Sequence, residues 1–401
     1  MRKHFTTTNL LDCSPDWIVG LSRGDNIDVV YFDFSKAFDS IIFAKLLNLN
    51  FFGIVGNLLV WISRFIHGRT QRVISENCFS SLADVISGVP QGSVLGPILF
   101  LIFINDVVST CCGNTNVKLF ADDLKLHSIY DISNTCGPLN LQHSIDQLVL
   151  WSNVWQLKIN SNKCQVLSIR NKTRTNTTCD YTLEGSHLRN VSIITDLGIN
   201  IDSNLSFKLH ISTVITKSLQ RVGTFFRGFS SRRFDIVRKM FVTYIRPLLE
   251  YNSNIWNPTH KYLVDKLENV QRQFTKRITS ISHLTYLERL SILELESLEL
   301  RRLRFDLIQY YKILNNLTPL NHAKYFTYHQ PSSFSRKPSP FLIKPINSPN
   351  YLSTSFFNRS VDCWNSLPQT LKETNSLVTF RKNLSMIDLS SFLIGSAFNI
   401  S

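Results

Sequence analysis

The segment Val117-Lys118-Leu119-Phe120-Ala121-Asp122-Asp123-Leu124-Lys125-Leu126-His127 sets the architecture of the first half of this chain. Apolar and polar residues alternate before and after a short polar break, which predicts two strands joined by a tight turn. The two adjacent aspartates repel each other unless a cation lies nearby. A solvated turn is the alternative explanation, since Asp is common in turns, and the sequence upstream decides between the two.

Two features upstream favour a chemical role for the aspartates. Residues 27–32 (IDVVYF) predict a buried strand that ends directly before Asp33. A carboxylate at the end of a buried strand needs a hydrogen-bond or ionic partner, or a chemical function, to offset the cost of its partial burial. Residues 87–97 (SGVPQGSVLGP) predict a Gly/Pro-rich loop that opens an apolar helix over residues 98–108. Glycine lets backbone approach a ligand closely, and a helix N-terminus favours phosphate.

The remaining pattern predicts an α+β first half and a mainly helical second half. We expect helices over 40–49, 54–67 and 139–157, short strands at 71–75 and 82–86, strands on both sides of Lys163, a strand pair ending near 201, helices from 205 to about 317, and a Pro/Ser-rich linker over 331–349 before a small C-terminal piece.

Charge is distributed unevenly along the 401 residues. Residues 1–200 hold 16 Lys+Arg and 16 Asp+Glu, whereas residues 201–401 hold 27 and 13, so the whole net charge of +14 lies in the second half. This asymmetry predicts a catalytic body followed by a part that grips a polyanion; a basic surface kept for solubility is the alternative.

Composition excludes several other classes of protein. The eight cysteines show no CxxC pair and no zinc spacing, which is typical of free thiols in a reducing compartment. No apolar run is long enough to span a bilayer, and residues 1–4 do not begin a signal peptide. We therefore expect an intracellular protein that is not secreted and has no membrane partner.

Taken together, Asp33, the glycine-rich loop and the Asp122-Asp123 turn predict a nucleotidyl-transfer site. Carboxylates on neighbouring strand ends can hold two Mg²⁺ ions, which favour a few carboxylates plus substrate phosphates over a complete protein cage. Two such ions assist an in-line displacement of pyrophosphate by a 3′-hydroxyl. We expect the three carboxylates to converge at one edge of a sheet.

On these motifs the chain resembles the reverse transcriptases of non-LTR, LINE-type (jockey-like) retrotransposons. Residues 33–39 (DFSKAFD) resemble motif A of that family, 87–97 motif B, 120–123 (FADD) motif C, 157–163 (LKINSNK) motif D, and 197–199 (LGI) the primer-grip region. The tail is also similar, with ELRR at 299–302 and WNSLP at 364–368. The resemblance covers most of residues 2–385.

The resemblance implies roles for individual residues. Asp33, Asp122 and Asp123 would be the metal carboxylates for Mg²⁺, or Mn²⁺ in its place, and Lys163 would be the acid that protonates pyrophosphate. A solvated loop lysine is the alternative for Lys163. The nucleotide pocket would contain Phe34, Phe38 as a steric gate against the sugar 2′ position, Gln91 and Gly92. We expect Asp39 to cap the following helix and His127 to be a strand-edge residue without a chemical role.

The resemblance also implies how the chain is divided. The expected fold is a ferredoxin-like polymerase palm, an antiparallel sheet with packing helices, followed by a mainly α-helical thumb. The expected parts are 1–25 as a remnant of the fingers region, 26–203 as the palm, 204–325 as the thumb, 326–350 as a linker and 351–401 as a small C-terminal region. The thumb candidates for phosphate contacts are Arg221, Arg227, Arg232, Arg233, Arg238 and Lys239, with a solvated basic helix face as the alternative.

The function implied is RNA-directed DNA polymerisation, with dNTPs added to a DNA primer on an RNA template. Members of this family carry a fingers subdomain before motif A, and only 32 residues precede Asp33, so we expect an N-terminally truncated copy. The alternative is a catalytically inactive remnant that at most binds nucleic acid. A viral RNA-dependent RNA polymerase is a third and weaker interpretation, because such enzymes usually carry Gly before the Asp pair.

Overall fold

The computed structural model describes residues 5–47, 53–111, 113, 115–131, 136–171, 179–229, 233–328, 341–344 and 353–395. These residues form two compact units: one comprises 24–192, and the other combines the N-terminal 23 residues with 193–401. We call them the sheet unit and the helical unit. The segment expected to be a remnant of the fingers region therefore packs within the helical unit, as α1 (Thr6–Arg23).

The sheet unit contains a five-stranded sheet in the order β11-β8-β1-β7-β6. Apart from shorter insertions, the main elements have a βαββαβ order along the chain: β1 (Asn26–Phe32), α4 (Leu95–Ile104), β6 (Asn116–Phe120), β7 (Asp123–Tyr130), α5 (Cys136–Trp155) and β8 (Gln165–Ile169). The pairs β1–β7, β1–β8 and β6–β7 are antiparallel, and β11 (Arg189–Val191) joins β8 in parallel. This order of strands and helices is the ferredoxin-like arrangement that the sequence predicts.

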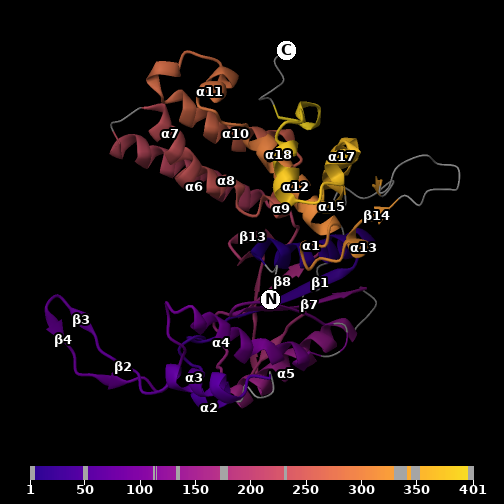
Figure 1. Cartoon of the computed structure of the whole chain (residues 1–401). Coiled ribbons are helices and arrows are strands. Elements are labelled where there is room, and N and C mark those ends of the chain that lie inside the picture. Colours follow the sequence, from indigo (N-terminus) through magenta and orange to yellow (C-terminus); the bar gives the residue numbers. More distant parts are fainter. Residues whose placement is uncertain are drawn as a thin grey trace. The chain divides into compact units, whose positions relative to one another are not determined.

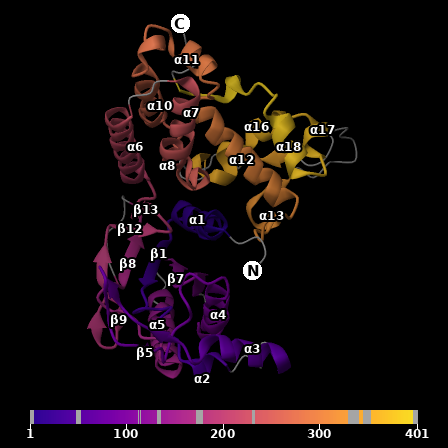
Figure 2. The same ribbon diagram turned by 60° about the vertical axis from the view of Figure 1, so that its left-hand side comes forward.

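Helices α4 and α5 lie on one face of this sheet (Figures 1 and 2). Val30 and Phe32 of β1 and Leu126 of β7 share a hydrophobic core with apolar side chains of both helices, including Phe100 and Ile145. Side chains two apart on a strand point to the same face, so the alternation seen in the sequence places these residues on the helix side. The core fixes where the ends of β1 and β7 lie.

The segment between α3 (Gly56–Ile66) and the glycine-rich loop forms a projecting two-stranded ribbon (Figure 1). It is built from β2 (Thr70–Gln71), β3 (Ile74–Ser75), β4 (Cys78–Phe79) and β5 (Ala83–Asp84), with β2 paired to β5 and β3 to β4. The predicted helix over 40–49 is limited to α2 (Phe43–Leu46) in the described residues. Two further short pairs follow β8 in the chain: β9 (Thr182–Leu183) with β10 (Ser186–His187) in the sheet unit, and β12 (Ile193–Asp196) with β13 (Ile199–Asp202) at the start of the second segment of the helical unit.

The helical unit consists mainly of helices that follow β13. They are α6 (Lys208–Gly228), α7 (Phe234–Met240), a π-helical turn (Phe241–Ile245), α8 (Arg246–Glu250), α9 (Ser253–Trp256), α10 (Lys261–Lys276), α11 (Tyr286–Ile292), α12 (Leu298–Leu314), α13 (His322–Tyr325), α15 (Phe356–Arg359), α16 (Val361–Ser366), α17 (Gln369–Lys372) and α18 (Leu377–Leu384). No helix in the described part of the chain is both long enough and apolar enough to cross a bilayer.

The C-terminal helices complete the core of the helical unit. The Tyr310 ring of α12 contacts the rings of Phe356 and Trp364, and Tyr311 stacks on Phe380 at a ring separation of 4.2 Å. Most of the predicted linker lies outside the described residues, but β14 (Thr327–Tyr328) and β15 (Leu342–Ile343) pair within its bounds. The C-terminal piece is therefore part of the helical core.

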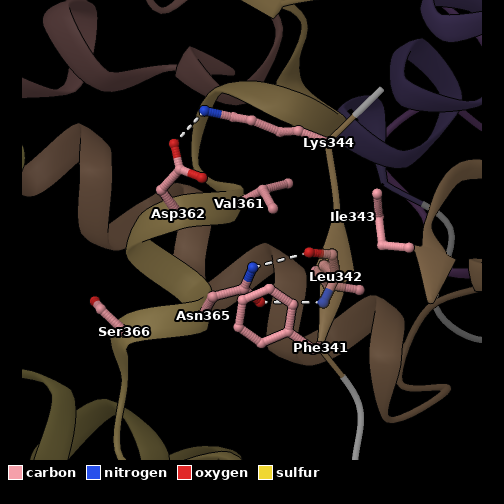
Figure 3. A pocket seen from close by; sticks show the side chains of 8 residues that line it. All are labelled: Phe341, Leu342, Ile343, Lys344, Val361, Asp362, Asn365 and Ser366. Atoms are coloured by element: carbon pink, nitrogen blue, oxygen red, sulfur yellow. Dashed lines mark hydrogen bonds and ion pairs between the residues drawn. The ribbon is translucent and has the colours of Figure 1, made fainter. Parts of the chain in front are cut away.

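Asn365, in the tail motif WNSLP, holds β15 in place (Figure 3). Its side-chain amide donates to Leu342 O at 2.8 Å and accepts from Leu342 N at 3.1 Å. Lys344 and Asp362 form an ion pair beside it, and these residues line a groove with Phe341 and Val361. The motif thus has a structural task, which is to fix the β14–β15 ribbon to α16.

Candidate active site

Strand pairing places Asp33 beside the Asp122-Asp123 turn. In the antiparallel register of β1 and β7, Phe32 lies opposite Leu124, so Asp33 and Asp123 are each one residue beyond the last pair. Asp122 occupies the turn between β6 and β7, in which Ala121 has a positive φ of 54°. The three aspartates, which are far apart in sequence, therefore lie at the same edge of one sheet.

The predicted motif D loop is bonded alongside the segment that follows β1. The Lys163 ammonium lies 3.3 Å from Asp33 Oδ2, Asn160 N–H donates to Asp33 O at 2.7 Å, and Ser35 N–H donates to Lys158 O at 2.8 Å. The side chains of Lys163 and Asp33 are 66% and 39% exposed, so solvent reaches the pair. The structure thus brings together two residues that the sequence assigned to the same reaction.

The carboxylates of Asp33, Asp122 and Asp123 fit a magnesium site in which substrate phosphates supply the remaining ligands. Asp122 is half-buried and Asp123 exposed, and all three side chains offer carboxylate oxygens, the ligands that Mg²⁺ prefers. Among the described residues, however, no three His, Cys, Asp or Glu side chains are grouped closely enough to hold a metal ion. The convergence of three carboxylates on shared ions therefore stays a prediction.

The glycine-rich loop is bonded to the turn that follows Asp33. Gly88 N–H donates to Ile41 O at 2.8 Å and Val89 N–H donates to Phe38 O at 3.0 Å. Gly88 has a φ of 81°, and a Cβ there would lie 2.7 Å from Asp39 Cα. Only glycine satisfies both conditions, because an L side chain would strain the backbone and collide with the neighbouring main chain. Motifs A and B therefore meet through backbone contacts.

Arg69 adds a bond to this junction that no motif in the sequence predicts. Its guanidinium donates to Gly88 O at 2.6 Å and to Ile66 O at 2.8 Å, and it lies over the Phe43 ring. Burial lowers the pKa of Arg69, although the group stays charged. An Arg that bonds only backbone carbonyls leaves no local pattern, so spacing in the sequence could not have revealed it.

The two predicted pocket phenylalanines occupy different environments. Phe38 is half-buried, and its ring stacks on Phe100 of α4 at 4.4 Å. Phe34 is 5% exposed, and its ring lies 6.2 Å from that of Trp151 in the hydrophobic core. The Phe34 ring cannot reach a substrate in this packing, so Phe34 supports the wall of the site. Phe38 keeps its predicted role as a proposal.

Gln91 and Gly92 are both exposed in the loop. Gln91 Nε2 donates to Asp39 Oδ1 at 2.7 Å, and Ser87 Oγ donates to Asp39 O at 2.8 Å. Asp39 is not the predicted helix cap: α2 begins at Phe43, and the residue before it, Ile42, makes no side-chain cap. The Asp39 carboxylate instead holds a side chain of motif B, 52 residues away.

The Cys164 thiol is buried in the sheet unit, close to Asp33. Burial raises the pKa of the Cys164 thiol to about 11, and the nearby Asp33 carboxylate adds to this shift, so the thiol is neutral at pH 7.

His127 is fully buried, because β7 lies between β1 and β6. The expectation that His127 is a strand-edge residue is therefore wrong, although nothing gives it a chemical role.

The predicted phosphate-binding residues all belong to the helical unit, and Arg232 lies outside the described residues. Several of the others are already engaged. Arg233 pairs with Asp235 at 3.1 Å, Arg238 pairs with Glu294 at 2.8 Å, and the Arg221 guanidinium donates to Tyr244 O. Arg227 and Lys239 are exposed, and neither makes an ion pair with another described residue. These two cations are the best placed of the set to meet a phosphate.

The predicted primer-grip residues form the tip of the β12–β13 hairpin in the helical unit. Leu197 and Gly198 have positive φ values of 45° and 82°, and Tyr251 Oη donates to Leu197 O at 3.0 Å. A leucine in the left-handed region costs about 1 kcal/mol. The hairpin carries this strain at a position that the sequence predicts to be functional.

Comparison with known proteins shows what residues 21–201, which include the whole sheet unit, resemble. The reverse transcriptase (RNA-dependent DNA polymerase) family matches residues 21–201. The RNA-directed DNA polymerase from mobile element jockey of Drosophila funebris is 26% identical over 262 residues, which are 62% of this chain and 28% of the relative. The probable RNA-directed DNA polymerase from transposon BS of Drosophila melanogaster is 27% identical over 274 residues, 63% of this chain and 29% of the relative.

Among solved structures, apo telomerase from Candida tropicalis aligns with a TM-score of 0.39 at 12% identity, over 73% of this chain and 50% of that one. A similarity this low does not define a relationship on its own. The chain spans less than a third of the length of these two mobile-element polymerases. Residues 21–201 are thus similar to the reverse transcriptase family, and the chain is similar to the polymerases of LINE-type mobile elements such as jockey.

Proposed function

We propose that this chain carries out RNA-directed DNA polymerisation. The observation that carries the proposal is the position of Asp33, which follows a buried strand, adjoins the Asp122-Asp123 turn and lies 3.3 Å from the Lys163 ammonium. Several carboxylates beside one cationic side chain suit a reaction in which negative charge develops on phosphate oxygens and the leaving group takes up a proton. The partners would be an RNA template, a DNA primer and dNTPs.

In the proposed reaction the primer 3′-hydroxyl gives its proton to solvent water, its oxygen bonds to the α-phosphorus of a dNTP, and the bond from that phosphorus to the bridging oxygen breaks, which releases pyrophosphate. Asp33, Asp122 and Asp123 would hold two Mg²⁺ ions, or Mn²⁺ in their place, which when bound stabilise the charge on the attacking and leaving oxygens. Lys163 would donate a proton to the leaving pyrophosphate. The distance of 3.3 Å from the Lys163 ammonium to Asp33 Oδ2 supports this role.

The glycine-rich loop and Phe38 would form the nucleotide pocket. The Phe38 ring is fixed against Phe100, and its carbonyl is bonded to Val89 of the loop. A fixed ring beside the sugar would exclude a 2′-hydroxyl and favour deoxyribonucleotides. Gln91 and Gly92 are accessible at the front of the same loop, where a nucleotide and a template base could meet them.

The helical unit would hold the nucleic acid through its basic surface. The second half of the chain carries the whole net charge of +14, and Arg227 and Lys239 are exposed on α6 and α7. Contacts of this kind grip the phosphate backbone without reading sequence. Such binding would place the protein in a nuclear or cytoplasmic ribonucleoprotein.

Primer extension on an RNA template tests the proposal, with Asp122→Asn as the matched control. Incorporation that needs a divalent cation and is abolished in Asp122→Asn would support it. Equal incorporation by both proteins would identify a contaminating polymerase and overturn it. Salt-sensitive binding of nucleic acid with no incorporation would favour the other candidate, an inactive relative that only binds nucleic acid.

A further inference from the structure

Asp39 links the segment after β1 to the glycine-rich loop through hydrogen bonds to which no function has yet been assigned. Asp39 lies on an exposed turn and has no place in the helix that follows. Its carboxylate accepts from Gln91 Nε2 at 2.7 Å, and its carbonyl accepts from Ser87 Oγ at 2.8 Å. Both partners are side chains of the glycine-rich loop, so Asp39 holds two side chains of that loop, one through its carbonyl and one through its carboxylate.

The main chain of Asp39 is itself held on both sides. Asp39 N–H donates to Lys36 O at 2.9 Å, and its Cα lies where a Cβ on Gly88 would collide. The carboxylate therefore projects from a fixed backbone position. Fixed groups orient a ligand-binding side chain at a smaller entropic cost than mobile ones, so the position of Gln91 depends on Asp39 more than on its own exposed loop.

The chemistry of the bond also fixes which way the Gln91 amide faces. An ionised carboxylate only accepts hydrogen bonds, so the amide must turn its NH₂ group toward Asp39. The carbonyl oxygen, Oε1, then faces away from Asp39 and can accept from a donor on a ligand. Without this constraint the amide could present either its oxygen or its nitrogen.

We propose that Asp39 is a positioning residue for the nucleotide pocket, which fixes the Gln91 side chain so that Oε1 is presented to a hydrogen-bond donor of the incoming nucleotide. The inference rests on the proposed polymerase function. Asp39 acts through Gln91 and does not touch the substrate itself. Removing its carboxylate weakens nucleotide binding and leaves the chemical step unchanged.

The experiment is a double-mutant cycle on primer extension, using Asp39→Ala, Gln91→Ala and the double variant. We expect Asp39→Ala to raise the KM for dNTP about tenfold with kcat changed less than about threefold, which corresponds to a loss of about 1.4 kcal/mol in binding. In the Gln91→Ala background the same change should have no further effect. Asp84→Asn, on the exposed ribbon, is the matched control and should leave both constants unchanged.

Three results would decide the matter. A KM for Asp39→Ala equal to that of the unaltered chain, or additive effects in the double variant, would overturn the inference. If the unaltered chain incorporates nothing, the proposed function fails, and the Asp39–Gln91 bond is then tested by NMR. The Gln91 side-chain amide protons should shift in Asp39→Asn, which retains the shape of the residue; unchanged resonances would overturn the inference even without activity.

Discussion

The Lys163 ammonium and the Asp33 carboxylate lie 3.3 Å apart, although 130 residues separate them in the sequence. The pair is exposed to solvent, so screening limits its contribution to stability. The pair lies at the edge of the sheet beside the Asp122-Asp123 turn, and the role proposed for Lys163 there is in the reaction and not in folding.

Replacing Lys163 should separate these two roles. We expect Lys163→Met to lower the rate of nucleotide incorporation by at least about 100-fold, as removal of a general acid does. Its free energy of unfolding should change by less than about 1 kcal/mol. Single-turnover primer extension and urea unfolding measure the two effects. Lys158→Met, at an exposed position in the same loop, is the control; an equal loss of rate in both variants would contradict a specific role.

Gly88 and Gly92 form a matched pair in the glycine-rich loop. Both have φ near 80°, but a Cβ on Gly88 would meet Asp39 at 2.7 Å, whereas one on Gly92 would meet nothing within 4 Å. Each Ala variant should lose about 1–2 kcal/mol from backbone strain. Gly88→Ala should lose about 1–3 kcal/mol more, because the two motifs must move apart. Chemical denaturation measures the difference, and equal losses would show that the loop can shift freely.

His210 should make the stability of the helical unit depend on pH. The imidazole is 5% exposed, accepts from Asn200 N–H at 3.2 Å, and packs against Trp256. Burial, with a smaller effect from Lys217, lowers its pKa from 6.5 to about 4. Between these values the unfolded chain binds a proton that the folded chain does not, so stability falls as pH falls.

The full effect corresponds to about 3 kcal/mol at most, reached below pH 4. Hydrogen exchange of the α6 amides at pH 7, 6, 5 and 4.5 measures it. His210→Gln should flatten the dependence, while His283→Gln, at an exposed position, should leave it intact. A slope that survives in His210→Gln would assign the dependence to another group.

The cations of α6 and α7 should differ in their contribution to nucleic-acid binding. Arg227 and Lys239 make no ion pair with another described residue, whereas Arg233 is paired with Asp235. Arg227→Gln combined with Lys239→Gln should reduce the slope of log Kd against log salt by about 2, since each substitution removes one cation that can neutralise a phosphate. Arg233→Gln should reduce it by less than about 1. Titrations of an RNA–DNA duplex at several salt concentrations measure these slopes; equal reductions per residue would contradict the distinction.

Local pattern predicted the elements that carry the site. The alternation around Asp122 predicted the β6–β7 hairpin, and the apolar run before Asp33 predicted β1, because period-two burial is a property of neighbouring residues. The resemblance implied a ferredoxin-like sheet, and the observed order β8-β1-β7-β6 agrees with it. Once that order is fixed, the position of Asp33 beside Asp123 is a consequence of register.

What the sequence could not predict depends on contacts between distant segments. The edge or centre position of His127 is decided by which strands flank β7, and the partner of Asp39 is a side chain 52 residues away. Phe34 and Phe38 look equivalent in the sequence, yet one ring is in the core and the other is half-buried. The Pro/Ser-rich stretch suggested a separate C-terminal piece, but Phe380 packs on Tyr311.

The packing of Phe356, Trp364 and Phe380 on α12 determines what a mutation that shortens the chain from its C-terminus would do. A premature stop codon in the Pro/Ser-rich stretch would leave intact residues 21–201, which match the reverse transcriptase family. It would nevertheless expose the rings of Tyr310 and Tyr311 and remove one wall of the helical unit. Loss from the 3′ end would thus damage folding before any codon for residues 21–201 was touched.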